Sequence, residues 1–511
     1  MIHLIEIEPF DPAANAPRIL RFGTFGFTTE PGDTPANAHF DDLVKDPGNF
    51  ERFLFGRSRT RGESDVGGGD IQLVNADGSL DGLLDLAFDG RPIRIWSLES
   101  QETPWAERRT VFTGTMEQAE FPSRAVTIRI RDMLDALREP LERPAYLGTT
   151  TSGGLTIAEG NTDLKDVKKP RLYGRALNIA PVTVDQFDNL YQVSDRAIAE
   201  ISNVRDNGVK LTATGDHADL AALKGAVMTG GQYATCLALG LLRTYTRPAG
   251  TLTLDAAEGA TLADRSVARN VARVLDGLAV VDAGSIDALH AEAPAEAGFW
   301  TGTADVSPLR IASALLESIG GWLVPDRFGT FRVGRLRLPS GEGVVRITTD
   351  FLLGGDSLFR NATADEGAGV PARSVTVRYG RAWTTYSEAD LKDVASDDVY
   401  RAFAIQEFRQ IKLPVEANTT LHPKGPDLTK DTCLVLEADA KAEAERWRAI
   451  EGDRRDLFVL DCWGDDVAAV DLDDVITLEV DRFGMGGGRP LRVIGLTESR
   501  LNNHTEIEAW G

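Results

Sequence analysis

The sequence of 511 residues has few of the residues that build redox or metal sites. Its three cysteines, Cys236, Cys433 and Cys462, lie far apart, and no two of its six histidines lie within five residues of each other. Neither set has the spacing of a disulfide framework or of a zinc site. We therefore expect three buried structural thiols, synthesis in a reducing cytoplasm and no bound metal.

Long apolar runs and an excess of basic residues are also missing. No stretch of 18 apolar residues occurs, and the start, MIHLIEIEPF, lacks the basic segment of a signal peptide. Lys and Arg number 55 against 78 Asp and Glu, which gives a formal charge of −23. An acidic surface repels phosphate, so the composition argues against a protein that binds duplexes or membrane surfaces.

Several segments resemble known binding or catalytic motifs, but each lacks the spacing or the sequence context that the motif requires. Residues 77–82, DGSLDG, resemble the start of a calcium loop, but Phe88 stands where the loop needs a bidentate Glu. The glycines of 484–488 precede a strand-like run rather than a helix, and G-x-S-x-G does not occur. The acidic clusters at 461–466 and 471–474 are expected to form a solvated face. We predict no catalytic, cofactor-binding or metal-binding residues, no cofactor, and a protein that is not an enzyme.

Strand patterns dominate what is present. Gly (50) and Pro (23) are spread along the chain, and runs at 126–132, 250–255, 374–379 and 475–480 alternate apolar with polar residues. Helices are expected at 308–319, which Ser307 can cap, and at 437–450. Shorter helices are expected at 133–137, 218–223, 233–242 and 264–275. The pattern predicts a mainly β, multidomain protein with a few helices.

The two ends of the chain share a weak repeat. The first copy has RPIRIW at 91–96, a long strand with Gly114 at its centre, a turn, and AVTIRIR at 125–131. The second has DVITLEV at 474–480, a long strand with Gly495, a turn at 502–503, and HTEIEAW at 504–510. A glycine inside a strand marks a bend or bulge, as curled sheets and barrels need. All antiparallel meanders look alike in sequence pattern. On spacing alone, this general likeness therefore explains the repeat as well as a true duplication does.

Two stretches mark expected domain boundaries: 148–154, which is small and polar, and 361–374, which lacks large apolar residues apart from Val370. We predict an N-terminal β domain at 1–147, inserted α+β domains at 148–367 and a C-terminal β domain at 368–511. The two β domains should superimpose through the strands of Gly114 and Gly495.

Several phrases give the chain a resemblance to a known family. These are PRLYGRALNIAPVTVDQFDNLY at 170–191, IGGWLVPDRFGTFRVGRL at 319–336, LVNADGSLDG at 73–82, and the C-terminal helix followed by strands that end in EIEAW. Together they resemble the central tail hub, or baseplate hub, of long-tailed bacteriophages. The similarity extends over nearly the whole chain but includes no catalytic motif.

The resemblance implies a structural virion protein with two tail-tube-like domains, each a curled sheet or barrel, flanking the inserted domains. It implies a homotrimer whose six similar domains form a pseudo-six-fold ring at the tail tip. Its partners would be itself, the distal tail and tail-tube proteins, and fibre or peptidoglycan-facing tip proteins, with DNA only in transit during ejection. The protein would be made in the bacterial host cytoplasm and would reside in the viral tail.

Alternatives remain open at this point. One is another baseplate or receptor-binding component of the tail tip, and a second is a tail-associated cell-wall hydrolase that acts through scattered carboxylates. For the hub we expect a channel wall richer in Asp and Glu than in Lys and Arg, because phosphate binds to a basic wall. Glu479, Glu506 and Glu508 alternate away from an apolar strand face and are predicted to line the channel or its rim, with the outer wall of the ring as the other possible location.

Overall fold

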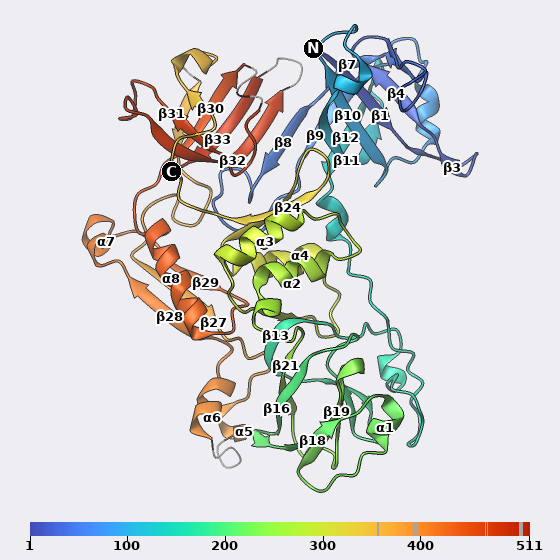
Figure 1. Ribbon diagram of the computed structural model, residues 1–511, viewed down its shortest axis with the longest axis vertical. Coiled ribbons are helices and arrows are strands. Elements are labelled where there is room, and N and C mark those ends of the chain that lie inside the picture. Colours follow the sequence, from blue (N-terminus) through green and yellow to red (C-terminus); the bar gives the residue numbers. More distant parts are fainter. Residues whose placement is uncertain (355–356, 392–396, 465–466, 468, 500–503) are drawn as a thin grey trace.

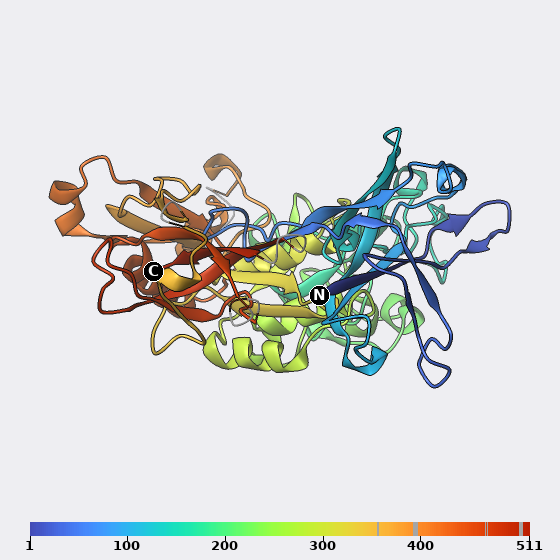
Figure 2. The ribbon, with the colours of Figure 1, turned by 90° about the horizontal axis from the view of Figure 1, so that it is seen from above.

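The computed structural model describes the whole chain except residues 355–356, 392–396, 465–466, 468 and 500–503. Two blocks of strands, one N-terminal and one C-terminal, occupy one end of the elongated molecule, a helical layer lies at its middle, and small sheets form the other end (Figure 1). Seen along the long axis, the two blocks lie side by side (Figure 2). The predicted mainly β, multidomain class is confirmed.

One continuous sheet runs through both strand blocks. Its path begins in the C-terminal block with β26 (Leu358–Asn361), β30 (Leu457–Trp463), β33 (His504–Trp510) and β32 (Arg489–Ser499). It continues through β8 (Asn49–Phe53), β9 (Gly68–Val74), β12 (Ala125–Asp132), β11 (Arg109–Glu120), β10 (Pro92–Leu98), β1 (Ile2–Ile7), β4 (Leu20–Gly23), β6 (His39–Asp42) and β5 (Phe27–Thr28). Three short strands branch from it, β7 (Val44–Asp46), β25 (Arg346–Ile347) and β31 (Val475–Leu478). In the described part of the chain the path does not close, so the sheet is open rather than a barrel.

The predicted repeat has the same strand order in both blocks. Strands β10, β11 and β12 are antiparallel neighbours, and so are β31, β32 and β33. Gly114 pairs with Asp132 and Gly495 with Glu508, and each long strand carries a bulge close to its glycine. The turn expected at 502–503 lies outside the described residues. The meander pattern is therefore confirmed, and the superposition of the two blocks stays a prediction.

The rest of the molecule consists of smaller sheets and eight described helices. One sheet has the order β17 (Val209–Lys210), β16 (Glu200–Asp206), β21 (Leu252–Ala257), β13 (Leu172–Ile179), β22 (Gly298–Trp300). A second has the order β14 (Val182–Asp185), β15 (Leu190–Gln192), β20 (Leu241–Thr244), β19 (Gln232–Cys236), β18 (Thr212–Asp216). A third has the order β28 (Arg409–Pro414), β27 (Ser374–Tyr379), β29 (Asp427–Asp431), and two hairpins pair β2 (Phe10–Asp11) with β3 (Ala16–Pro17) and β23 (Gly321–Pro325) with β24 (Phe331–Arg335). The helices are α1 (Leu220–Lys224), α2 (Val267–Leu275), α3 (Ala283–Glu292), α4 (Pro308–Glu317), α5 (Glu388–Leu391), α6 (Asp398–Ala404), α7 (Glu416–Leu421) and α8 (Glu437–Glu451).

The two principal helix predictions are confirmed as α4 and α8. Ser307 caps α4, because its Oγ accepts the Arg310 N–H at 3.2 Å. Gly320 follows α4 with φ +63°, a left-handed conformation that suits glycine. Of the shorter predictions, 264–275 becomes a 3₁₀ turn followed by α2, 218–223 becomes α1, and 133–137 becomes the 3₁₀ turn Asp135–Arg138.

The helix predicted at 233–242 is wrong. This segment forms β19 and β20, which pair with each other around Gly240 at φ +59°. Tyr233 and Thr235 are typical strand residues, and the left-handed glycine closes the connection. Cys236 therefore ends a strand and not a helix, although it is buried as expected. Helix α3 was missed because its first turn contains the weak helix former Gly284. Asp282 caps this helix by accepting two backbone N–H groups.

One hydrophobic cluster connects the helical layer with the C-terminal block. It contains α2, α4 and the buried Trp447 of α8, together with the inward faces of β30, β32 and β33. Leu54 and Phe55, which follow β8 in the N-terminal part of the chain, are fully buried in the same cluster. The chain therefore places an N-terminal segment in the core of the C-terminal half.

Candidate functional site at the junction of the strand blocks

The junction is made by residues 49–64, here called the joining arm. Its strand β8 pairs with β32 at five positions, from Asn49↔Ser499 to Phe53↔Gly495, but with β9 only at Glu51↔Gly68. A Cβ on Gly495 would lie 2.5 Å from Phe53 Cδ1, so the close approach of β8 needs glycine at that position. A strand from the front of the sequence therefore completes the sheet of the C-terminal block.

Three arginines of the joining arm bind carboxylates of the C-terminal half. Each guanidinium lies within hydrogen-bonding distance of its partner, and the arginines occur at nearly regular intervals along the arm. The pairs are Arg52–Asp471 at 2.8 Å, Arg57–Glu506 at 3.1 Å and Arg61–Glu451 at 2.6 Å. Thr60 adds a fourth contact by donating its backbone N–H and its hydroxyl to Asp365 at 2.9 and 2.7 Å. Charge complementarity thus adds to the backbone pairing in holding the arm in place.

Glu508 lies beneath the arm and not on a channel surface. Its carboxylate accepts the Ser58 backbone N–H at 2.6 Å and the Ser58 hydroxyl at 3.1 Å, and the residue is 2% exposed. Burial raises the pKa of this carboxyl. The expectation that Glu508 faces the channel or its outer wall is therefore wrong. The alternation of residues along β33 places Glu508 on the polar face of the strand, but the joining arm covers that face and buries the side chain.

A second group of charges joins three parts of the chain at one point. Arg52 lies between Asp471 and Glu498, and Glu498 also accepts a hydrogen bond from Arg327 at 3.1 Å. Arg327 lies in the turn of the β23–β24 hairpin, and burial lowers its pKa. The joining arm, β32 and this hairpin therefore meet in one cluster of charges, which fixes their relative positions.

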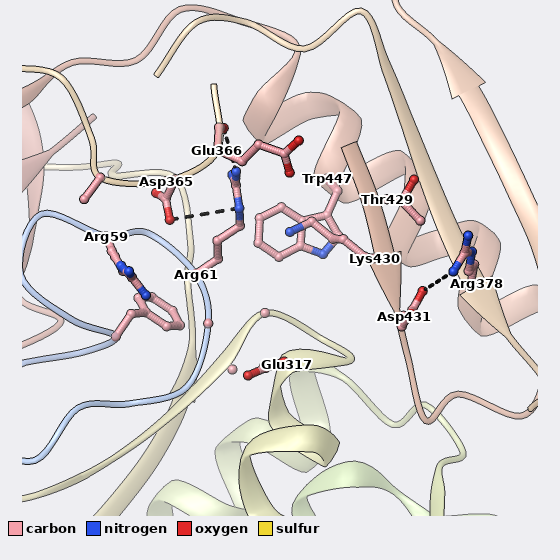
Figure 3. A pocket seen from close by; sticks show the side chains of 15 residues that line it. Arg59, Arg61, Glu317, Asp365, Glu366, Arg378, Thr429, Lys430, Asp431 and Trp447 are labelled. Atoms are coloured by element: carbon pink, nitrogen blue, oxygen red, sulfur yellow. Dashed lines mark hydrogen bonds and ion pairs between the residues drawn. The ribbon is translucent and has the colours of Figure 1, made fainter. Parts of the chain in front are cut away.

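A cavity of about 680 Å³ opens beside the joining arm. Arg59 and Arg61 of the arm form one wall, Glu317 at the end of α4 forms the floor, and β29 with Trp447 of α8 forms the opposite wall (Figure 3). Phe55 and Gly320 also line the cavity. The joining arm, the end of α4, and β29 with α8 thus all contribute to this cavity. Its volume is within the range of ligand pockets, although its lining is more polar than usual.

Lys430 is the most unusual group in the cavity. Its ammonium nitrogen lies 3.4 Å from the ring centroid of Trp447, a cation–π geometry. Burial lowers the pKa of Lys430 to about 7, and nearby Arg61 acts in the same direction while Glu451 opposes it. In the described part of the structure no carboxylate lies within ion-pair distance of this lysine.

The structure places the motifs that the sequence singled out in structural roles. Asp77 Oδ1 accepts the Ser79 N–H and hydroxyl in the predicted turn, and the glycines of 484–488 lie in the loop between β31 and β32. The acidic cluster 471–474 is not the solvated face that we predicted. Its side chains are partly buried because Asp471 binds Arg52, and Asp473 binds Arg492 at 2.9 Å. Residues 465–466 of the other cluster lie outside the described residues.

Histidines, cysteines and carboxylates are scattered over the described residues. No group of three or more His, Cys, Asp or Glu among them could hold a metal ion. All three cysteines are free thiols, and burial raises the pKa of Cys433 to about 11 and that of Cys462 to about 12. Ser266 and His290 lie 2.8 Å apart, but Ser266 is fully buried and caps α2. Nor does this part of the chain contain a helix that is long and apolar enough to cross a membrane.

Sequence reasoning missed the joining arm and the cavity. The only local signal was the series of basic residues Arg52, Arg57 and Arg61 in an acidic chain. Their partners lie more than 300 positions away, so no local pattern could have identified them. The lowered pKa of Lys430 likewise depends on burial and on the nearby Arg61, which only the folded chain brings together.

Comparison with known proteins gives matches of structure only. No protein-family model matches the sequence, and no curated protein matches it. Three solved structures are similar along almost the whole chain. They are a tail protein from Neisseria meningitidis MC58 (10% identity, 99% of this chain and 96% of that one, TM-score 0.42), the prophage MuSo2 43 kDa tail protein from Shewanella oneidensis (9%, 99% and 98%, 0.42) and a prophage tail protein from Listeria monocytogenes EGD-e (8%, 100% and 94%, 0.40). All three scores are below 0.5, so none of them decides the role of this chain.

Proposed function

We propose that this chain is the central hub at the distal end of a phage tail tube. Three copies would form a ring in which each copy contributes its two strand blocks, so that six similar blocks meet the tube above. The ring would join the tube to fibre-bearing or peptidoglycan-facing tip proteins and leave a channel for DNA. The proposal rests on the resemblance carried by the phrases at 73–82, 170–191 and 319–336 and on the repeated meander.

The observation that carries the proposal is the pairing of β8 with β32. It joins the two blocks edge to edge in one sheet, so that each chain would supply two adjacent segments of a ring wall. The two ends of that sheet, β26 and β5, remain open edges in the described chain. In this proposal they lie near the contacts with neighbouring copies.

The channel would be acidic, as the charge of −23 favours. Glu479 and Glu506 are partly exposed, and each already pairs with an arginine, Arg346 and Arg57 respectively. We retain both as residues of the wall or rim and remove the buried Glu508. An acidic wall allows DNA to pass because it offers phosphate no site for counterion release.

The proposal is tested by mass and symmetry. Light scattering of the purified chain, followed by imaging of the particles, should give the mass of three chains of 55.4 kDa and a ring with a central opening. A dimer, a six-copy ring or a monomer at every concentration would contradict it. Release of soluble fragments from purified peptidoglycan would instead support the cell-wall hydrolase.

A further inference from the structure

Strand β29 has an unpaired outer edge that faces the cavity. It pairs in parallel with β27 along Asp427–Asp431, and no other backbone or side-chain hydrogen bond to its backbone occurs within the described ranges. Thr429, Lys430 and Asp431 of β29 line the cavity, and Arg378 of the neighbouring strand β27 reaches it beside Asp431 (Figure 3). The free N–H and C=O groups of this edge therefore point toward open space. An edge of this kind is a template for another strand.

The cavity also contains basic side chains that have no ion-pair partner among the described residues. Arg61 pairs with Glu451, and Arg378 pairs with Asp431 at 3.1 Å. Lys430 and the exposed Arg59 have no ion-pair partner among the described residues, and they come from opposite walls (Figure 3). Two basic side chains without an ion-pair partner thus lie beside a free strand edge. Because burial lowers the pKa of Lys430, a carboxylate placed against it would favour its charged form.

We propose that the cavity beside β29 is a docking site for an extended acidic segment of a partner protein. The segment adds to the β28–β27–β29 sheet as a fourth strand and places a carboxylate against Lys430. Main-chain hydrogen bonds to β29 supply affinity, and the acidic side chain supplies specificity. The docking site does not depend on ring assembly, so it can be tested independently of the proposed hub function.

The lining sets the position of the acidic residue in the partner. Glu317 on the floor of the cavity and Glu366 in its lining have no ion-pair partner among the described residues, so a carboxylate near either of them would be repelled. Lys430 is on the α8 face of β29, where a cross-strand neighbour would lie about 5 Å away. The acidic side chain of the partner therefore belongs on the α8 face. A nucleic acid offers phosphate but no peptide backbone for the free edge, so the observations favour a peptide.

The test uses the full chain and two synthetic hexapeptides, Thr-Glu-Val-Glu-Val-Thr and Thr-Lys-Val-Lys-Val-Thr, both blocked at the ends. Calorimetry should show binding of the acidic peptide and none of the basic peptide at the same concentration. Hydrogen exchange should show that the acidic peptide protects amides of Asp427–Asp431 and leaves those of β28, the other edge of the sheet, unchanged.

Variants separate the role of charge from that of folding. Lys430→Met, which keeps the apolar stem, should weaken binding of the acidic peptide at least about tenfold, whereas Lys430→Arg should retain most of it. Lys412→Met is the matched control, because Lys412 is an exposed lysine on β28 of the same sheet. It should bind as the unchanged chain does. Arg59→Gln, at an exposed position, tests the charge of the opposite wall if Lys430→Met folds poorly.

Four outcomes would overturn the proposal. They are no binding of the acidic peptide at millimolar concentration, equal binding of both peptides, and binding that leaves the β29 amides unprotected, which would indicate a simple anion site. The fourth is protection of β29 that rises with protein concentration alone, which would make a second copy of this chain the occupant.

Discussion

Arg52 Nη2 lies 2.8 Å from Asp471 Oδ1, although 419 positions of the sequence separate the two residues. The Arg52 side chain is 10% exposed, and Glu498 lies on its other side at 3.7 Å. A single arginine of the joining arm therefore compensates two carboxylates of the opposite half of the chain.

Replacing Arg52 should destabilise the protein strongly. Arg52→Met leaves Asp471 and Glu498 without this cation, and we expect a loss of about 3 kcal/mol in the free energy of unfolding, because breaking a buried pair strands the remaining charge. Urea denaturation measures the loss. Arg138→Met is the control, since Arg138 forms only exposed pairs with Asp65 and Asp135, and it should cost about 0–1 kcal/mol. Equal losses of unfolding free energy in the two variants would show that the Arg52 contacts stabilise the protein no more than exposed ion pairs do.

Gly320 should tolerate no side chain. A Cβ there would lie 2.6 Å from Trp447 Cζ2, and φ is +63°. Gly320→Ala combines overpacking with backbone strain and should cost about 2–4 kcal/mol. Gly277→Ala is the matched control, because Gly277 has φ +72° but nothing within 4 Å of a Cβ, so only strain of about 1 kcal/mol should remain. Thermal unfolding that ranks the two variants alike would contradict the packing argument.

Gly495 should control the docking of the joining arm. In Gly495→Ala the new Cβ meets the Phe53 ring, so β8 should separate from β32 more often. Hydrogen exchange at Asn49–Phe53 should become at least about tenfold faster, with little change at β1. Gly487→Ala, in the open loop before β32, should leave that exchange unchanged. Unaltered protection of β8 in the Gly495 variant would mean that the arm is held by its ion pairs alone.

Asp132 should make stability depend on pH. Burial raises its pKa to about 7, and backbone N–H bonds from Gly67 and Leu134 offset only part of this effect. Because the pKa in the folded state is above the ordinary value of 3.8 for an Asp carboxyl, the folded state binds more protons than the unfolded state between about pH 4 and 7. This contribution is therefore complete below pH 4 and is lost as pH rises to 7, by up to about 4 kcal/mol.

The measurement for Asp132 is the difference in unfolding free energy between the unchanged chain and Asp132→Asn. Other titrating groups cancel in that difference. It should shrink as pH rises from 4 to 7 and stay constant above about pH 8. A difference that grows with pH would show that the carboxylate is ionised in the folded state throughout this range.

Local pattern predicted much of the fold. Alternation identified β12, β27 and β31, and the cap and exit residues of α4 placed that helix to within two residues of its end. The repeated meander around Gly114 and Gly495 was also readable, since it depends on neighbouring strands. The segment at 233–242 failed because strand formation there depends on β15 and β18, which lie elsewhere in the sequence.

The junction could not be predicted, because its determinants are not local. The burial of Glu508 depends on Ser58, 450 positions away. The period of β33 places Glu508 on the polar side of the strand, and only the covering arm turns that side into an interior. The cavity likewise arises where residues of the arm, α4 and β29 meet, and no segment alone carries a sign of it.

The pairing of β8 with β32 also delays part of the folding during synthesis, because the two strands are far apart in the sequence. At roughly 5–20 residues per second, the ribosome needs about 20–80 s to cover the 419 positions between Arg52 and Asp471. During that time β8, Leu54 and Phe55 have no partner from the C-terminal block, and an unpaired strand with an apolar extension promotes aggregation. The joining arm therefore cannot complete its contacts until the last strands emerge, although the rest of the N-terminal block has a hydrophobic core of its own.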